Sequence, residues 1–241
     1  QMCIRDSAGA MSLDFLSIFD REHEAFIASC ERVPVAAKVP SCPEWSVGDL
    51  LYHLYEVQYL WHRVSAEARS GFDGLSMPVR PADGSLVDVL RGEHVSYTSW
   101  LRANDPSSPQ WTWTGMRDFQ WLARRMAHEL AMHRVDADLA RGQATGIEPS
   151  LASDGIDEFL EFFRNGELTG TVHIHCTDVA GEWTIDRDGT VRREHAKGDC
   201  AIRGAASDLL LALWRRTSLD TCDVVGDAAV AAQFIAASRL D

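Results

Sequence analysis

Residues 119–140 have the sequence FQWLARRMAHELAMHRVDADLA, and this stretch decides the architecture of the first half of the chain. Leu122, Met126 and Ala137 recur at helical spacing, which is typical of one face of an α-helix. Gly142 follows as a stop signal, because glycine readily adopts the left-handed conformation that ends many helices. The segment therefore predicts a helix with one face turned towards a core.

Three more helices are predicted upstream, at residues 12–31, 46–69 and 85–101. The first carries His23 on its apolar stripe. The second opens with a capping box of Ser46 and Asp49, and the third with the similar pair Ser85 and Asp88. Residues 33–45 and 71–84 are expected to be loops, and WTWTG at 111–115 receives no assignment. Four helices joined by loops predict a four-helix bundle.

The sequence changes character near residues 142–153, beyond which short β-rich runs alternate with turns. Helices are expected at 154–164, 206–216 and 227–239, and strands at 171–177, 182–186, 191–195, 200–204 and 221–225. Strands followed by helices indicate a small α+β domain. We therefore expect two domains, a bundle at 11–145 and an α+β domain at 146–241.

Composition narrows the classes of function. The 241 residues include 23 Lys+Arg and 36 Asp+Glu, a formal charge of −13, which disfavours binding to nucleic acid or to an anionic membrane surface. Six cysteines without a CxxC pair indicate reduced thiols in a cytoplasmic protein. The first ten residues, QMCIRDSAGA, look like a translated adapter remnant, and we expect the native chain to begin at Met11.

Glu129 and His133 are the sharpest chemical feature. Side chains four residues apart on a helix reach the same point in space, and these two fall on the core-facing stripe. His53, at the edge of the stripe on the second helix, can add a second imidazole. Two histidines and one carboxylate suit Zn²⁺ with an open fourth position, and Fe²⁺ or Ni²⁺ fit the same donors. The alternative is a solvated ion pair without metal.

Other histidines carry less information. His173 and His175 lie on one face of a predicted strand, with Cys176 on the other, but no carboxylate accompanies them at an obvious spacing. Two histidines at this spacing can share a metal ion, but the favoured interpretation is that they line a cleft or an open sheet face. His94 is expected to be exposed. The dinucleotide, phosphate-loop and nucleophile-elbow motifs are absent from the sequence.

Four stretches in this order resemble the mycothiol-dependent maleylpyruvate isomerase family. They are SCPEWSVGDLLYHL at 41–54, ELAMHRVDA at 129–137, HIHCTD at 173–178 with GEW at 181–183, and GAASDLL at 204–210 with LWRR at 213–216. The resemblance covers nearly the whole chain from Met11.

The resemblance implies a DinB-like four-helix bundle followed by a small sterol-carrier-like α+β domain. It implies a divalent metal, usually zinc, held by His53, Glu129 and His133, with mycothiol as thiol cofactor in an actinobacterial-type cytoplasm. An active-site arginine of the family corresponds to Arg216, and Arg215 stands where relatives have glycine.

The expected activity is therefore that of a metal-dependent enzyme. It would use mycothiol for cis–trans isomerisation of a maleylpyruvate-like substrate, or for S-transfer to a small electrophile, with Arg216 holding a substrate carboxylate. Its expected partners are a small-molecule substrate and a thiol, without nucleic acid or membrane, in a monomer or homodimer. The alternative is a non-catalytic small-ligand-binding module with a structural metal.

Overall fold

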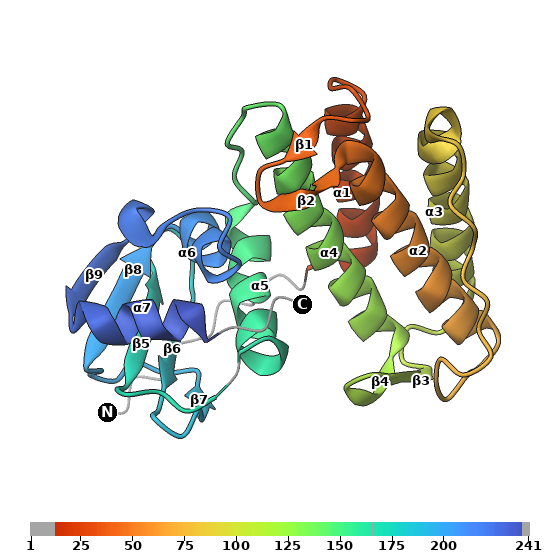
Figure 1. Ribbon diagram of the computed structural model, residues 1–241. Coiled ribbons are helices and arrows are strands. Elements are labelled where there is room, and N and C mark those ends of the chain that lie inside the picture. The colour runs from red at the N-terminus through yellow and green to blue at the C-terminus, as the bar shows by residue number, and fades with distance from the viewer. Residues whose placement is uncertain (1–12, 165, 238–241) are drawn as a thin grey trace.

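The structure is a computed structural model that describes residues 13–164 and 166–237 (Figure 1). Four long helices form the first half: α1 (Phe15–Cys30), α2 (Val47–Ala66), α3 (Leu86–Ala103) and α4 (Phe119–Ala140). α1 packs along α4, and α2 packs along α3 and touches α4 (Figure 1). The predicted four-helix bundle is confirmed, and the predicted bounds of the fourth helix match those of α4.

The two predicted capping boxes have different outcomes. At α2, the Asp49 amide donates to Ser46 Oγ at 3.2 Å and the Ser46 amide donates to Asp49 Oδ2 at 2.8 Å, so this box is confirmed. At α3, Ser85 makes no side-chain capping bond within the described chain, and that prediction is wrong. A short 3₁₀ turn, η1 (Asp83–Ser85), places the backbone of Ser85 in the helical region, whereas a side-chain cap needs an extended residue.

Two hairpins occupy segments that the sequence left as loop or unassigned. β1 (Lys38–Val39) pairs with β2 (Cys42–Ser46), and β3 (Pro109–Thr112) pairs with β4 (Gly115–Asp118). Pro43 lies within β2, which is tolerated because a two-stranded hairpin has free edges where a missing N–H costs little. The first hairpin matters for function, because it lies against α4 beside the site described below.

A five-stranded sheet forms the second half, in the order β7-β6-β5-β8-β9. Its strands are β5 (Val172–Cys176), β6 (Glu182–Ile185), β7 (Val191–Arg192), β8 (Cys200–Gly204) and β9 (Asp223–Gly226). β5 and β8 are parallel and the other pairs are antiparallel. α5 (Pro149–Phe162), η2 (Leu219–Thr221), α6 (Ala206–Leu213) and α7 (Ala228–Ala236) complete the fold. The predicted α+β arrangement is confirmed.

One face of the sheet belongs to the core. Ile174 is buried and is in register with Trp183 on one side and Ile202 on the other, and all three are nearly inaccessible. By strand alternation, His173 and His175 lie on the opposite face.

The predicted domain boundary at 145–146 falls between α4 and α5 and stays a prediction, and the suspected leader lies outside the described residues. None of the helices within the described ranges is long and apolar enough to span a membrane.

Candidate metal centre

Three side chains from two helices converge on one point. His53 lies on α2, while Glu129 and His133 lie one turn apart on α4. His53 Nε2 and His133 Nε2 are 3.1 and 3.3 Å from the same oxygen, Glu129 Oε1. Ligands about 2.0 Å from a tetrahedral zinc ion lie roughly 3.3 Å from one another. The donor set therefore fits a small divalent cation, and the structure brings together the three residues that the sequence singled out.

Asp136 holds the imidazole of His133 in place. His133 Nδ1 donates to Asp136 Oδ2 at 2.9 Å. Burial raises the pKa of Asp136, but its bonds with His133 and Arg216 outweigh burial and hold that pKa well below its usual range, so Asp136 is a carboxylate acceptor. Because the proton lies on Nδ1, a neutral His133 presents the lone pair of Nε2 towards Glu129, which is the tautomer that a metal ligand needs.

Arg216 also binds this carboxylate, and it comes from the other half of the molecule. Its Nε and Nη2 donate to the two oxygens of Asp136 at 2.9 and 2.8 Å, and its Nη1 donates to the carbonyl oxygen of Trp214 at 2.9 Å. Ser41, next to the first hairpin, donates its hydroxyl to Asp136 at 2.5 Å. Three distant segments therefore meet at one buried acid, whose exposure is 0%.

The second oxygen of Glu129 is held by a buried arginine. Arg125 Nη2 donates to Glu129 Oε2 at 2.5 Å, and its Nη1 donates to the carboxylate of Glu158 on α5. Arg125 lies four residues before Glu129 on the same helix, so helical spacing could have placed it at the site. The sequence analysis did not single it out. Its position lets Glu129 turn one oxygen, Oε1, towards the two imidazoles.

Burial and charge set the protonation of the centre. Burial by itself raises the pKa of Glu129, but hydrogen bonds with His133 and His53 and the charge of Arg125 hold it well below its usual range. Burial lowers the pKa of His133, yet its bonds to Asp136 and Glu129 outweigh burial and raise that pKa to about 9. A cation that binds here must displace this proton, because a ligating imidazole is neutral.

A cavity of about 540 Å³ opens in front of these ligands. It is lined from both halves of the molecule, by Ser41, Cys42, Trp45, His53, Arg125, Glu129, Met132, His133, Phe163, Trp214, Arg215 and Arg216. The Trp45 ring lies 4.9 Å from that of His53 and 6.3 Å from that of His133. The volume is in the range of small-molecule sites, and its wall combines aromatic faces with a few charged groups.

Arg215 and Arg216 have separate structural roles. Arg215 has a φ of 56°, in the left-handed region that favours glycine, which accounts for the glycine expected at this position in relatives. Arg216 follows directly after this turn and points to Asp136. The side chain of Arg216 is 10% exposed, and it forms part of the cavity wall.

Asp138 and His94 have partners of their own. Asp138, two residues after Asp136 on α4, accepts from Ser29 at 2.6 Å and from Arg134 at 3.1 Å. His94 is buried rather than exposed, between Gln58 and Asp20, because α1 packs over that face of α3.

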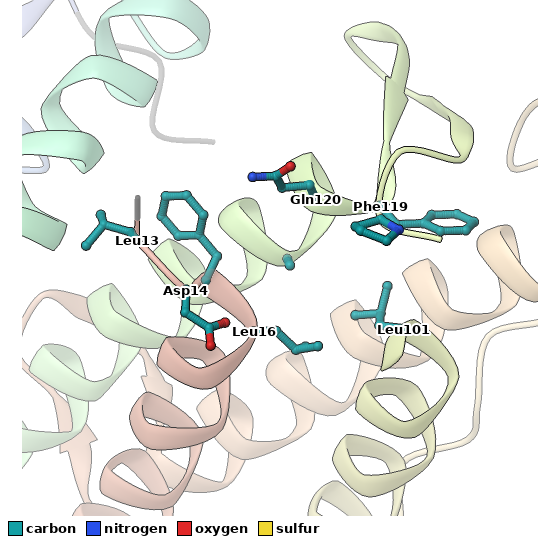
Figure 2. A pocket seen from close by; sticks show the side chains of 9 residues that line it. Leu13, Asp14, Leu16, Leu101, Phe119 and Gln120 are labelled. Carbon is teal, nitrogen blue, oxygen red and sulfur yellow. The ribbon is translucent and has the colours of Figure 1, made fainter. Parts of the chain in front are cut away.

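A second cavity, of about 320 Å³, lies between the beginnings of α1 and α4 (Figure 2). Its lining is mainly apolar and includes Leu13, Leu16, Leu101 and Phe119. The carboxylate of Asp14 at its edge is already used, because it accepts from the amide of Ser17 as the cap of α1. This cavity therefore offers packing space rather than reactive groups.

Comparison with known proteins follows the same division of the chain. The family model described as the mycothiol maleylpyruvate isomerase N-terminal domain matches residues 16–138, and the model of the family's C-terminal domain matches residues 150–233. None of the curated proteins matches the chain.

Two solved structures share the fold. A crystal structure of the mycothiol-dependent maleylpyruvate isomerase aligns with a TM-score of 0.60 at 14% identity, covering 89% of this chain and 93% of that chain. A histidine-to-alanine mutant of that enzyme aligns with a TM-score of 0.58 at 13% identity, with the same coverage. Identity this low shows the fold alone. With both family models matched in order along most of its length, the chain belongs to the mycothiol-dependent maleylpyruvate isomerase family.

Proposed function

We propose that this chain is a metal-dependent enzyme that uses the thiol mycothiol to isomerise a maleylpyruvate-like substrate or, as an S-transferase, to add the thiol to a small electrophile. The observation that carries the proposal is the convergence of His53, Glu129 and His133 on the wall of a cavity that can admit small molecules. The thiol and the substrate class are those in the name of the family.

The three proposed ligands leave room for a reactant. His53 keeps 30% of its side chain exposed, while Glu129 and His133 are more deeply buried at 18% and 11%. A divalent ion held here with an open coordination position would lower the pKa of a thiol, so that thiolate is available at neutral pH.

The surrounding side chains have roles of their own. Asp136 orients His133, and Arg125 orients Glu129, so the donor atoms are held before any ligand binds. Trp45 and Trp214 contribute aromatic walls that exclude water.

Arg216 is proposed to hold a substrate carboxylate. Its three hydrogen bonds to Asp136 and Trp214 use one hydrogen on each nitrogen, and a guanidinium carries five N–H groups, so each Nη keeps a second hydrogen for a ligand in the cavity.

The test combines metal analysis with thiol-dependent turnover. Purified protein should carry about one divalent ion at this centre and should convert maleylpyruvate only when mycothiol is present. His53→Ala should lose the ion and the activity together, and full metal occupancy in that variant would contradict the ligand assignment.

Measuring the thiol separates the proposed reactions. Isomerisation leaves its concentration unchanged, whereas S-transfer consumes one thiol for each product. The alternative of a non-catalytic binding module predicts metal and ligand binding without turnover of either kind.

A further inference from the structure

A second group of ligating side chains lies on the sheet, on the side of β5 away from Ile174. We call it the sheet-face cluster, and it consists of His173, His175, Glu182 and His195. The sequence showed the first two without a carboxylate at a recognisable spacing. The sheet supplies that carboxylate, because the antiparallel register of β5 and β6 places Glu182 directly opposite His175.

All three imidazoles of the cluster point at one atom. His173 Nε2, His175 Nδ1 and His195 Nδ1 lie 2.9, 3.1 and 2.6 Å from Glu182 Oε1. One carboxylate oxygen offers about two lone-pair sites, so three N–H donors exceed what it can accept. The same atoms around a tetrahedral zinc ion would lie roughly 3.3 Å apart, within a few tenths of an ångström of two of these separations.

The cluster is partly enclosed and joins two segments. The side chain of His173 is 8% exposed, while that of His195, on the loop after β7, is 72% exposed. That loop is tied to the sheet beside the cluster, because Thr184 Oγ1 donates to the carbonyl oxygen of Glu194 at 2.9 Å, and Thr184 is in register with His173. A cation in the cluster would fasten the loop to the strands.

We infer that the sheet-face cluster binds a divalent transition-metal ion of the zinc class. Imidazole nitrogens with one carboxylate oxygen suit Zn²⁺, Ni²⁺ and Cu²⁺, whereas Mg²⁺ and Ca²⁺ prefer oxygen ligands. His173, His175 and Glu182 form the core of the site, because their ligating atoms all lie within 4.8 Å of one another. His195 lies outside this group of mutually close atoms, but its Nδ1 contacts the same oxygen of Glu182, and we assign it as a fourth ligand on that contact. This inference does not rest on the proposed function, since no cluster residue lines the described wall of the cavity at the first centre.

The test is the zinc stoichiometry of the full chain, without an affinity tag, after equilibrium dialysis against micromolar Zn²⁺. His175→Ala and Glu182→Gln should each bind one ion per chain fewer than the parent protein. His53→Ala should retain the cluster's ion, which separates failure of this inference from failure of the proposed function. Unchanged stoichiometry in both cluster variants would overturn the inference.

The chain offers a matched control. His62 makes a single histidine–carboxylate contact, Nδ1 to Glu93 Oε1 at 2.6 Å, away from either group of candidate ligands. His62→Ala should therefore leave the zinc content unchanged. A loss of one ion in this variant would show that removal of any histidine lowers the zinc content, and it would overturn the assignment.

A second measurement works on the parent protein even if a variant fails to fold. Lys197 is exposed on the loop that carries His195. Zinc at 100 times its dissociation constant should slow tryptic cleavage at Lys197 by about 100-fold, because the loop can enter the protease only after His195 has left the ion. A cleavage rate that does not respond to zinc would contradict the inference.

Discussion

Replacing Asp136 by Asn tests whether the buried acid sets the affinity of the proposed metal centre. The variant keeps the shape of the side chain but removes the charge that accepts from His133 and Arg216. Loss of such a supporting contact weakens metal binding by about 10- to 100-fold, which is about 1.4 to 2.7 kcal/mol. The expected change lies at the upper end, because Asp136 also fixes the tautomer of His133 and is fully buried.

The same variant should destabilise the fold. Removing one partner of a buried ion pair costs about 3 to 5 kcal/mol, and the Asp136–Arg216 pair is 0% and 10% exposed at its side chains. Asn still offers one acceptor oxygen, so we expect about 3 kcal/mol. This ion pair joins α4 to the segment after α6. Its loss should therefore weaken the packing of the two halves of the molecule against each other.

Zinc affinity is measured by competition with a fluorescent chelator, and stability by urea unfolding of the metal-free protein. Asp138→Asn is the matched control: Asp138 is also buried and hydrogen-bonded, on the same helix, but it binds Ser29 and Arg134 rather than a proposed ligand. It should lose stability and keep its zinc affinity. The reasoning is refuted if Asp136→Asn binds zinc within twofold of the parent, or if both variants lose affinity equally.

Three further predictions concern stability. Burial, together with the neighbouring charges of His94 and Arg91, lowers the pKa of His23 to about 3, and neither ring nitrogen has a hydrogen-bond partner among the described residues. The unfolded chain binds a proton near pH 6.5 that the folded chain excludes, so stability falls as the pH drops below 6.5, by about 2.7 kcal/mol at pH 4.5. His23→Leu should remove this pH dependence of the free energy of unfolding, measured by urea unfolding at pH 7 and 4.5. An equal loss of stability between these pH values in the variant and the parent protein would contradict the prediction. Arg215→Gly should raise the free energy of unfolding by about 1 kcal/mol, because glycine adopts the positive φ without strain; a lower melting temperature would count against this reason. Ser46→Ala should cost about 1 kcal/mol through loss of the α2 cap, and an unchanged thermal melt would show that the cap contributes nothing.

The site shows where sequence reasoning works and where it stops. Glu129 and His133 could be paired from the sequence, because an α-helix brings side chains four residues apart to one face. Asp49 could be assigned to the cap of α2 for the same local reason. The prediction failed at Ser85, where a preceding 3₁₀ turn changed the backbone, and at His94, which α1 covers.

By itself, the sequence determined the long helices, the strands of the five-stranded sheet and the chemical character of their faces, since these depend on residues a few positions apart. Only the tertiary structure decided which faces meet. It placed His53 against Glu129, 76 residues away, and Arg216 against Asp136, 80 residues away. It also gave the histidines of β5 a carboxylate partner, through strand register rather than through spacing within one strand. Such contacts depend on how whole helices and strands pack, and a local sequence pattern does not predict that packing.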